Sequence, residues 1–475
     1  MADPRDQHVV AEIATQVRQG DLNGARVKCD AFLNSVGEAA RQVPVRIWLG
    51  MVEQRSGSLP AALVQYELAR QFDRRNPHLT LQLGLVHFEM GDLARAEPLY
   101  RDAIRLEPRL PLAHYNLGVL LQQKRSFPAA CRAFEAALVH QPGFPEALNN
   151  LGNVLIECED LTRAEHCYRQ AIVQRSDFSF AHHGLGLLLM QQMKHAEALP
   201  SLRAAVDHNP AFIDGWLDLA ECQAQCGDVA AAKISIAAVL ARDPQHAIAG
   251  FRRALYAGEQ PSSTPPELVE RLYAGMAATF DAHLVERLGY QIPVRLKVAL
   301  QSWLGQFEAS RADKPLVLDL GCGTGLFGAQ MRSAAKHLVG VDLSPEMLTA
   351  ARARGVYDAL VASDLVAYLK ANKPPVDLIA ATDVLIYVGD LTTLFAEAAG
   401  HLTANGAFAF SIETPAELTE GMYLQPSGRY AHSVRYIAQL AAANSMEISV
   451  CDAAVIRTEN ALDVKGFLFI LEKRM

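Results

Sequence analysis

The sequence lacks three features, and each absence excludes a class of protein. It has no apolar run of about 18 residues, so we expect no membrane insertion. Its 8 cysteines show no paired spacing, so we expect neither a disulfide scaffold nor a metal site. Its net charge of −8 includes no long block of one sign, so nucleic acid is not an expected partner.

The first residues and the length of the sequence indicate the location of the protein and the number of its domains. The first residues, M-A-D-P-R-D-Q-H, contain no apolar segment, so we expect no signal peptide and a cytoplasmic location. A chain of 475 residues exceeds what one hydrophobic core usually supports. We therefore expect two or more domains.

A period of 34 residues runs through the first half of the chain. Glycines stand at 50, 84, 118, 152 and 186, alanines at 62, 96, 130, 164, 198 and 232, and leucines at 83, 117, 151, 185 and 219. A helix–turn–helix unit explains this pattern, because the glycine lets the partner helix approach and the alanine keeps that helix thin at the crossing. One unit cannot bury its apolar face alone, so the units are expected to stack into a solenoid.

An aromatic residue lies four positions after several of these alanines, and G-D-L or G-D-V turns recur between the helices. The aromatic residues are Tyr66, Tyr100, Phe134 and Tyr168. The pattern resembles the tetratricopeptide repeat (TPR), in about six or seven copies over residues 6–245. The resemblance implies an all-α TPR solenoid whose groove binds a protein or peptide.

The repeats end in a polar stretch, Y-A-G-E-Q-P-S-S-T-P-P-E, at residues 256–267. Its serines and prolines are typical of a linker. We therefore predict a repeat domain over residues 1–250, a linker over 251–268 and a second domain over 269–475.

Apolar runs suited to buried parallel strands alternate with helical stretches in the second domain. They read L-V-L-D-L at 316–320, H-L-V-G-V-D at 337–342, V-D-L-I-A-A at 376–381 and A-F-A-F-S-I at 407–412. The first run is followed at once by Gly321, Gly323 and Gly325. A loop of this kind brings backbone N–H groups close to a bound nucleotide.

Two nucleotides fit this loop at first sight. Gly323, Gly325 and Gly328 satisfy the dinucleotide pattern G-x-G-x-x-G, with Asp342 19 residues beyond Gly323. S-adenosylmethionine (SAM) is favoured because Asp319 precedes the loop and a carboxylate there suits a cationic amino group. Asp364, after a third strand, would accept a hydrogen bond from an adenine amino group. Two final strand-like runs, at 446–456 and 466–473, leave no room for a dehydrogenase substrate domain.

These residues resemble a class I SAM-dependent methyltransferase over roughly residues 270–475. The resemblance implies an α/β Rossmann-like, seven-stranded sheet whose last strand is antiparallel. It implies the following roles: Gly321, Gly323 and Gly325 line the methionine portion, Asp342 binds the ribose hydroxyls, Leu343 packs on adenine, Asp364 and the Leu365 amide bind the adenine edge, and Asp383 lies near the methionyl group.

Fewer sequence motifs indicate where the methyl acceptor would bind. The fourth strand is followed by T-D-V-L, which is not the N-P-P-Y type of motif that holds amide or base nitrogens, and no cysteine follows it. His432, Tyr387 and Glu413 are candidate catalytic residues, with His432 as a base. Arg429, Tyr430, Tyr273 and Phe280 are further candidates near the acceptor or the pocket.

Three functions stay open on the sequence alone. The first is methylation of a protein side chain recruited by the repeats. The second is methylation of a small molecule, glycan or lipid intermediate, with the repeats docking a partner protein. The third is a scaffold that binds SAM without turnover, which the intact glycine loop and acids disfavour.

Overall fold

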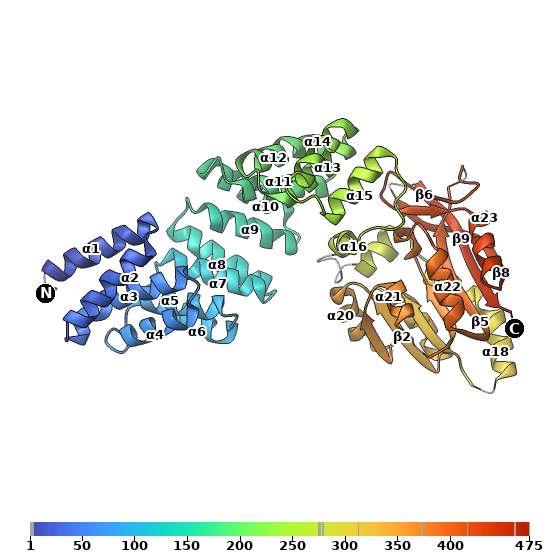
Figure 1. Cartoon of the computed structure of the whole chain (residues 1–475), viewed down its shortest axis with the longest axis horizontal. Coiled ribbons are helices and arrows are strands. Elements are labelled where there is room, and N and C mark those ends of the chain that lie inside the picture. Colours follow the sequence, from blue (N-terminus) through green and yellow to red (C-terminus); the bar gives the residue numbers. More distant parts are fainter. Residues whose placement is uncertain are drawn as a thin grey trace. The chain divides into compact units, whose positions relative to one another are not determined.

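The computed structural model describes residues 4–273, 277, 280–311, 313–371, 374–415, 417–459 and 462–474. The chain divides into two compact units, Met1–Ala232 and Lys233–Met475. The first consists of helices and the second contains a sheet covered by helices (Figure 1). This confirms the predicted order, an all-α solenoid followed by an α/β domain.

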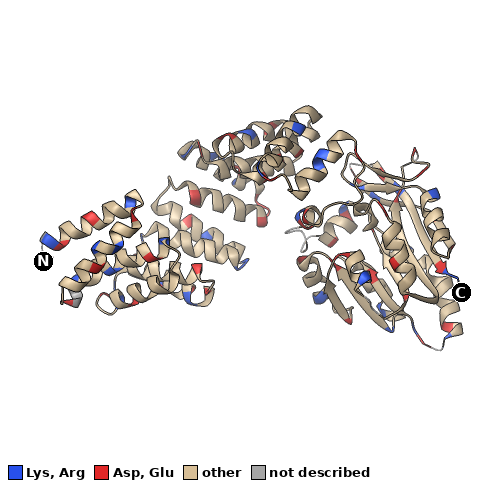
Figure 2. Cartoon of the chain, in the orientation of Figure 1, with Lys and Arg blue, Asp and Glu red and all other residues tan. Residues whose placement is uncertain are grey.

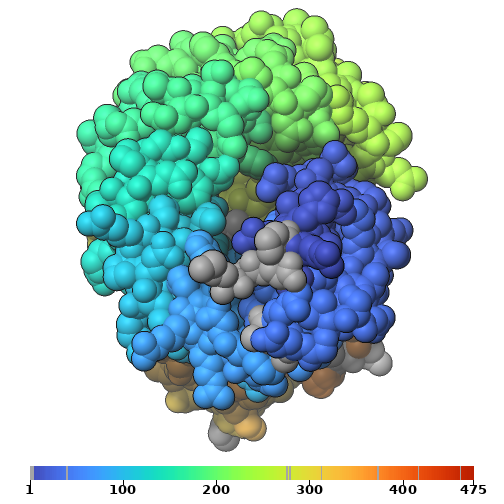
Figure 3. Space-filling view, turned by 90° about the vertical axis from the view of Figure 1, so that its left-hand side faces the viewer, coloured from blue at the N-terminus to red at the C-terminus, as the bar shows by residue number. Residues whose placement is uncertain are grey.

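The first unit is built from antiparallel helix pairs joined by short turns. Its helices are α1 (Pro4–Gln19), α2 (Leu22–Ser35), α3 (Ala39–Arg55), α4 (Leu59–Arg70), α5 (Pro77–Glu89), α6 (Leu93–Leu106), α7 (Pro111–Gln123), α8 (Phe127–His140), α9 (Pro145–Glu157), α10 (Leu161–Gln174), α11 (Ser179–Gln191), α12 (His195–His208), α13 (Ile213–Gln225) and α14 (Val229–Leu240), the last of which crosses the boundary. The repeat helices, blue to green in Figure 3, wind around a hollow.

The recurring glycines allow the two helices of a pair to cross closely. A Cβ atom at Gly118 would lie 2.6 Å from Cε1 of Phe134, and one at Gly84 would lie 2.6 Å from Cε1 of Tyr100. Both aromatic side chains are buried. The turns are fixed by capping, since the Asp92 carboxylate accepts a hydrogen bond from the Arg95 N–H at the start of α6.

The division between the units falls within α14, earlier in the chain than the predicted end at residue 250. Helix α15 (Ala247–Ala257) and the stretch after it belong to the second unit. The predicted linker is in fact tied to that unit, because the Ser262 carbonyl accepts from Gly389 N–H and the Thr264 N–H donates to the Tyr387 carbonyl, both at 2.9 Å. Through these backbone hydrogen bonds, part of the proline- and serine-rich stretch packs on the loop after β4 (Val376–Ala381) of the second unit.

The second unit holds a seven-stranded sheet in the order β3-β2-β1-β4-β5-β9-β8. Its strands are β1 (Leu316–Leu320), β2 (His337–Asp342), β3 (Ala359–Ala362), β4 (Val376–Ala381), β5 (Leu402–Glu413), β8 (Met446–Glu459) and β9 (Leu462–Lys473). Strands β1 to β5 pair in parallel, and β9 pairs antiparallel with both β5 and β8. The sheet and its antiparallel last strand agree with the expectation.

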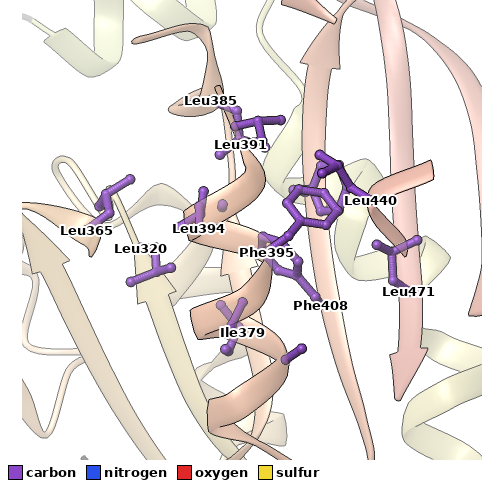
Figure 4. Close-up of a cluster of buried hydrophobic side chains, with 14 of the residues drawn as sticks. Leu320, Leu365, Ile379, Leu385, Leu391, Leu394, Phe395, Phe408, Leu440 and Leu471 are labelled. Atoms are coloured by element: carbon purple, nitrogen blue, oxygen red, sulfur yellow. The ribbon is translucent and has the colours of Figure 1, made fainter. Parts of the chain in front are cut away.

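Helices cover the sheet on both faces. They are α16 (Pro266–Tyr273), a π-helix (Ala282–Arg287), α17 (Ile292–Ala299), α18 (Gln301–Ser310), α19 (Leu326–Met331), α20 (Pro345–Arg354), α21 (Leu365–Lys370), α22 (Thr392–His401) and α23 (Val434–Ala443), with 3-10 turns at Arg332–Ala334 and Leu385–Tyr387. One core packs α21, α22 and α23 on the sheet around Phe395 and Phe408 (Figure 4). A second core on other residues of the same strands includes Trp303 and Phe327, from α18 and α19.

A small hairpin, β6 (Met422–Leu424) with β7 (Tyr430–His432), was not foreseen from the sequence. Acidic and basic residues are interspersed in both units (Figure 2). Among the helices that the structure describes, none has the length and apolar character needed to cross a bilayer.

Candidate functional site

A pocket of about 380 Å³ opens at the carboxyl ends of the parallel strands. This edge is where ligands bind in helix-covered parallel sheets. The loops after β1, β2, β3 and β4 line one part of the pocket. Residues of α16, of the π-helix and of the stretch before α16 line another part, among them Ser263, Tyr273 and His283.

The glycine loop after β1 needs its glycines for two different reasons. Gly321 has φ +68°, and a Cβ atom there would lie 2.4 Å from Cγ2 of Val384. Gly323 has φ +53°, with no atom within 4 Å of the position of its missing Cβ. Both line the pocket, so a ligand can approach the bare backbone at this point.

Asp342, the last residue of β2, presents a fixed carboxylate to the pocket. Its Oδ2 accepts from Gly323 N–H at 2.8 Å and its Oδ1 from Ser344 N–H at 2.9 Å. Burial raises the pKa of this carboxyl group, and the backbone hydrogen bonds oppose that rise. Each oxygen keeps a further lone pair, so the carboxylate can accept from a pair of hydroxyl groups.

The adjoining wall contains the predicted adenine-side residues Leu343, Asp364 and Leu365. The Asp364 carboxylate caps α21 through Oδ1, which accepts from Ala367 N–H at 2.9 Å. Its other oxygen has no hydrogen bond among the described residues. The structure thus brings the acids after β2 and β3 into one pocket with the glycine loop.

Asp383, after β4, lies in a buried network of charges. It has φ +53°, and both of its oxygens accept from Nη1 of Arg457, at 2.9 and 3.1 Å. Burial raises the pKa of Asp383 to about 6, with the Arg457 charge opposing the rise. Arg457 is 2% exposed and also pairs with Glu413 and Glu459.

The segment that precedes the sheet covers the pocket with aromatic side chains. The Tyr273 hydroxyl lies 2.5 Å from the Tyr387 hydroxyl, and the Tyr273 and Phe280 rings are 5.5 Å apart. Asp281 accepts hydrogen bonds from Thr324 in the glycine loop and from Arg354. Asp281 thereby attaches this segment to the glycine loop.

Two of the predicted cofactor residues, Asp319 and Gly325, do not line the pocket. Tyr357 explains both, since its hydroxyl donates to Asp319 Oδ2 at 2.6 Å and its ring would lie 2.9 Å from a Cβ at Gly325. Asp319 is completely buried, and its Oδ1 has no partner in the part of the chain that the structure describes. A direct contact of these two residues with the cofactor stays a prediction.

The proposed base His432 lies outside the pocket lining and is completely buried. Its Nε2 lies 2.9 Å from the Val388 carbonyl and 3.0 Å from the Gly389 carbonyl, so this nitrogen donates. Burial lowers the pKa of His432 to about 4. A neutral, buried imidazole held in this way ties β7 to the loop after β4, and a role of His432 as a base stays a prediction.

Glu413 is also outside the pocket lining, while Tyr387 is within it. Glu413 Oε1 accepts from Arg457, and its Oε2 accepts from Gln425 Nε2 at 2.8 Å. Both oxygens therefore serve the charge network. Sequence reasoning missed Arg457, which directly follows the apolar run A-A-V-I of β8, and His283, which also lines the pocket.

Comparisons with known proteins agree with this geometry. A methyltransferase domain family model matches residues 318–410, and tetratricopeptide repeat models match residues 81–130, 120–180 and 189–255. The chain contains tetratricopeptide repeats and a methyltransferase domain. This domain and its relatives imply S-adenosylmethionine as the methyl donor.

The relatives of the methyltransferase domain match a limited stretch. The trans-aconitate 2-methyltransferase of Azoarcus sp. (strain BH72) is 38% identical over 102 residues, which are 21% of this chain and 40% of that protein. The ubiquinone biosynthesis O-methyltransferase of Xylella fastidiosa (strain 9a5c) is 32% identical over 98 residues, 20% and 39% of the two chains. The chain thus spans less than two thirds of either relative's length.

Two solved structures are similar to part of this chain. MamA is 21% identical, with a TM-score of 0.32 and coverage of 34% of this chain and 95% of that chain. YrrB, described as a TPR protein with an unusual peptide-binding site, is 20% identical, with a TM-score of 0.33 and coverage of 39% and 95%.

Proposed function

We propose that this chain transfers a methyl group from SAM to an acceptor bound in the pocket of the methyltransferase domain. The observation that carries the proposal is the Asp342 carboxylate, which two backbone N–H groups hold at the pocket wall beside the bare glycine loop. Asp342 would hold the ribose hydroxyls, and Gly321 and Gly323 would lie along the methionine portion. Leu343 would pack on adenine, beside Asp364 and Leu365.

SAM supplies a methyl group on a sulfonium, whose leaving group is a neutral thioether. The residues of this chain then have three tasks: they orient the acceptor, they exclude water and, where the acceptor carries a proton, they remove it. Tyr273, Phe280 and Tyr387 serve the second task, since they line the pocket from its covering side.

For the acceptor, our leading proposal is a protein side chain brought by the repeats. Asn116 in α7 supports a peptide-binding role, because it is partly exposed and its amide is open to a ligand. An asparagine amide can pair with both groups of a peptide backbone.

The second proposal, a small-molecule acceptor with the repeats docking a partner protein, draws on the relatives. Their printed names refer to trans-aconitate and to ubiquinone biosynthesis. Under this proposal the methyltransferase pocket alone selects the acceptor.

Calorimetry with SAM tests the cofactor assignment on the full chain. Asp342→Asn should weaken SAM binding at least roughly tenfold, because hydrogen bonds to a charged group contribute about 1.5–3 kcal/mol. The control is Glu346→Gln, an exposed acid nearby in α20 that does not line the pocket. Equal affinities for the wild type and Asp342→Asn would contradict the assignment.

Labelling of a cell extract tests the acceptor class. With methyl-labelled SAM, label in a discrete protein band is the result expected for recruitment by the repeats. Label confined to small molecules would favour the second proposal.

A further inference from the structure

Arg429 lines the pocket and keeps hydrogen-bond donors that the protein does not use. It is in the turn between β6 and β7, and its Nη1 donates to Glu459 at 2.5 Å. No other hydrogen bond of this guanidinium occurs among the described residues, although an arginine carries five N–H donors. Its side chain is 30% exposed and lines the pocket, so several donors remain for a ligand.

The turn that carries Arg429 is held in place from several sides. The Gln425 N–H donates to the Arg429 carbonyl at 2.9 Å, and the Gln425 side chain donates to Glu413 at 2.8 Å. The Tyr430 hydroxyl donates to the Pro261 carbonyl at 2.7 Å. The guanidinium is therefore mounted on a fixed hairpin.

The two pocket phenols add a further donor near Arg429. One hydroxyl of the Tyr273–Tyr387 pair donates to the other, so one of the two protons is left over. Burial raises the pKa of both phenols, and the nearby Arg429 charge opposes that rise in each. Both phenols are consequently protonated at neutral pH, and the leftover proton is available to a ligand.

The carboxylates of the same region already accept hydrogen bonds from the protein. Both oxygens of Asp383 bind Arg457, both oxygens of Glu413 bind Arg457 and Gln425, and Glu459 Oε1 accepts from Arg429 and Arg457. Arg429 and one phenol, in contrast, keep donors that the protein does not use. A ligand that pairs with these donors must offer oxygen acceptors.

The charges of the cluster favour a ligand with one negative charge over a ligand with two. Three carboxylates, Asp383, Glu413 and Glu459, pair with two guanidinium groups, so the cluster holds more acids than bases. A dianion such as a phosphate monoester would be repelled more strongly than a monoanion. A carboxylate carries one charge, and its two oxygens match the planar fork of an arginine.

We infer that the methyl acceptor carries a carboxylate group, which Arg429 binds with help from the Tyr273–Tyr387 pair. This inference rests on the proposed function and specifies its substrate class. The carboxylate belongs either to a small organic acid or to a side chain or C-terminus of a protein, and the chemistry of recognition is the same. Arg429 is a specificity-determining residue, because it selects the acceptor without touching the transferred methyl group.

The test uses the full chain saturated with S-adenosylhomocysteine, with benzoate as the probe. Calorimetry and ligand-observed NMR should show benzoate binding at least tenfold more tightly than benzamide or phenyl phosphate. Arg429→Gln should weaken benzoate binding at least tenfold without changing the affinity for S-adenosylhomocysteine. Arg429→Lys, which keeps the charge and loses the fork, should lie between the two.

The matched control is Arg435→Gln, because Arg435 is a nearby exposed arginine that pairs with Glu420 and does not line the pocket. It should bind benzoate like the wild type. Benzoate that fails to bind, binds no better than benzamide, or binds Arg429→Gln as well as the wild type would overturn the inference while S-adenosylhomocysteine still binds. Loss of S-adenosylhomocysteine binding by the wild type would instead contradict the proposed function, and the inference with it.

Competition distinguishes the two sources of carboxylate. Displacement of benzoate by succinate alone supports a small acid as acceptor. Displacement by a blocked, glutamate-containing tripeptide supports a protein side chain. Either result supports the carboxylate site. If neither compound displaces benzoate, the inference is overturned.

Discussion

Replacing Asp319 by asparagine should stabilise the second unit of the chain (Lys233–Met475, below called the methyltransferase unit) more at high pH than at low pH. Asp319 lies in β1, is completely buried, and accepts one hydrogen bond, from Tyr357 at 2.6 Å. Burial raises its pKa from 3.8 to about 7, and the hydrogen bond from Tyr357 only partly opposes this. The folded protein therefore keeps this carboxyl group protonated over a pH range in which the unfolded chain ionises it.

The sign of the effect follows from proton linkage. The folded pKa is raised, so the stability that Asp319 contributes is fully present below pH 3.8 and is lost as the pH rises through about 7. At about 1.36 kcal/mol per pKa unit, the loss is about 1.5 kcal/mol at pH 5 and about 4 kcal/mol at pH 8. Asparagine does not titrate, so Asp319→Asn escapes this loss.

The assay compares the stability of Asp319→Asn with that of the wild type at pH 5 and at pH 8. Two pH values are needed because the asparagine side chain also destabilises the fold. Its amide donors would be buried without partners, at about 1–3 kcal/mol, but this cost does not change with pH. The stability difference between Asp319→Asn and the wild type should therefore rise by about 2.5 kcal/mol from pH 5 to pH 8. In a thermal scan this corresponds to a shift of roughly 5–10 °C for a unit of this size.

The transition of the methyltransferase unit is identified as the one that S-adenosylhomocysteine shifts in the wild type, since a ligand stabilises the unit that binds it. Asp358→Asn is the control, because Asp358 is an exposed acid paired with Arg332. A stability difference that is the same at pH 5 and pH 8 would refute the argument about Asp319.

Two further predictions concern packing and buried charge. Gly118→Ala should destabilise the repeat unit by about 1–3 kcal/mol, because the added Cβ would lie 2.6 Å from Phe134, whereas Gly37→Ala meets no atom within 4 Å and should change the urea midpoint little. Arg457→Gln should cost the methyltransferase unit about 3–5 kcal/mol, since it leaves the buried acids Asp383 and Glu413 without their cation, and a thermal transition unchanged from the wild type would contradict this.

The tertiary structure placed residues that no local pattern could locate. Arg457 and Asp383 are 74 positions apart in the chain and meet because β8 joins the sheet through β9. Tyr357 covers Asp319 and packs against Gly325, so two residues of the glycine-loop motif are withheld from the pocket. His432 is buried, and its Nε2 donates to two backbone carbonyls, of Val388 and Gly389.

The sequence by itself determined the repeats, the strands of the parallel sheet and the part of the pocket that we propose for SAM. These features are periodic or local: the 34-residue step repeats one helix pair, and Gly321, Gly323 and Asp342 lie at the carboxyl ends of the adjacent strands β1 and β2. Only the tertiary structure decided the part of the pocket that we propose for the acceptor, where Arg429, Tyr273 and Tyr387 come together from a hairpin, a helix before the sheet and a loop after β4. The physical reason is that side-chain convergence depends on how distant elements pack, and neither period nor spacing in the chain records it.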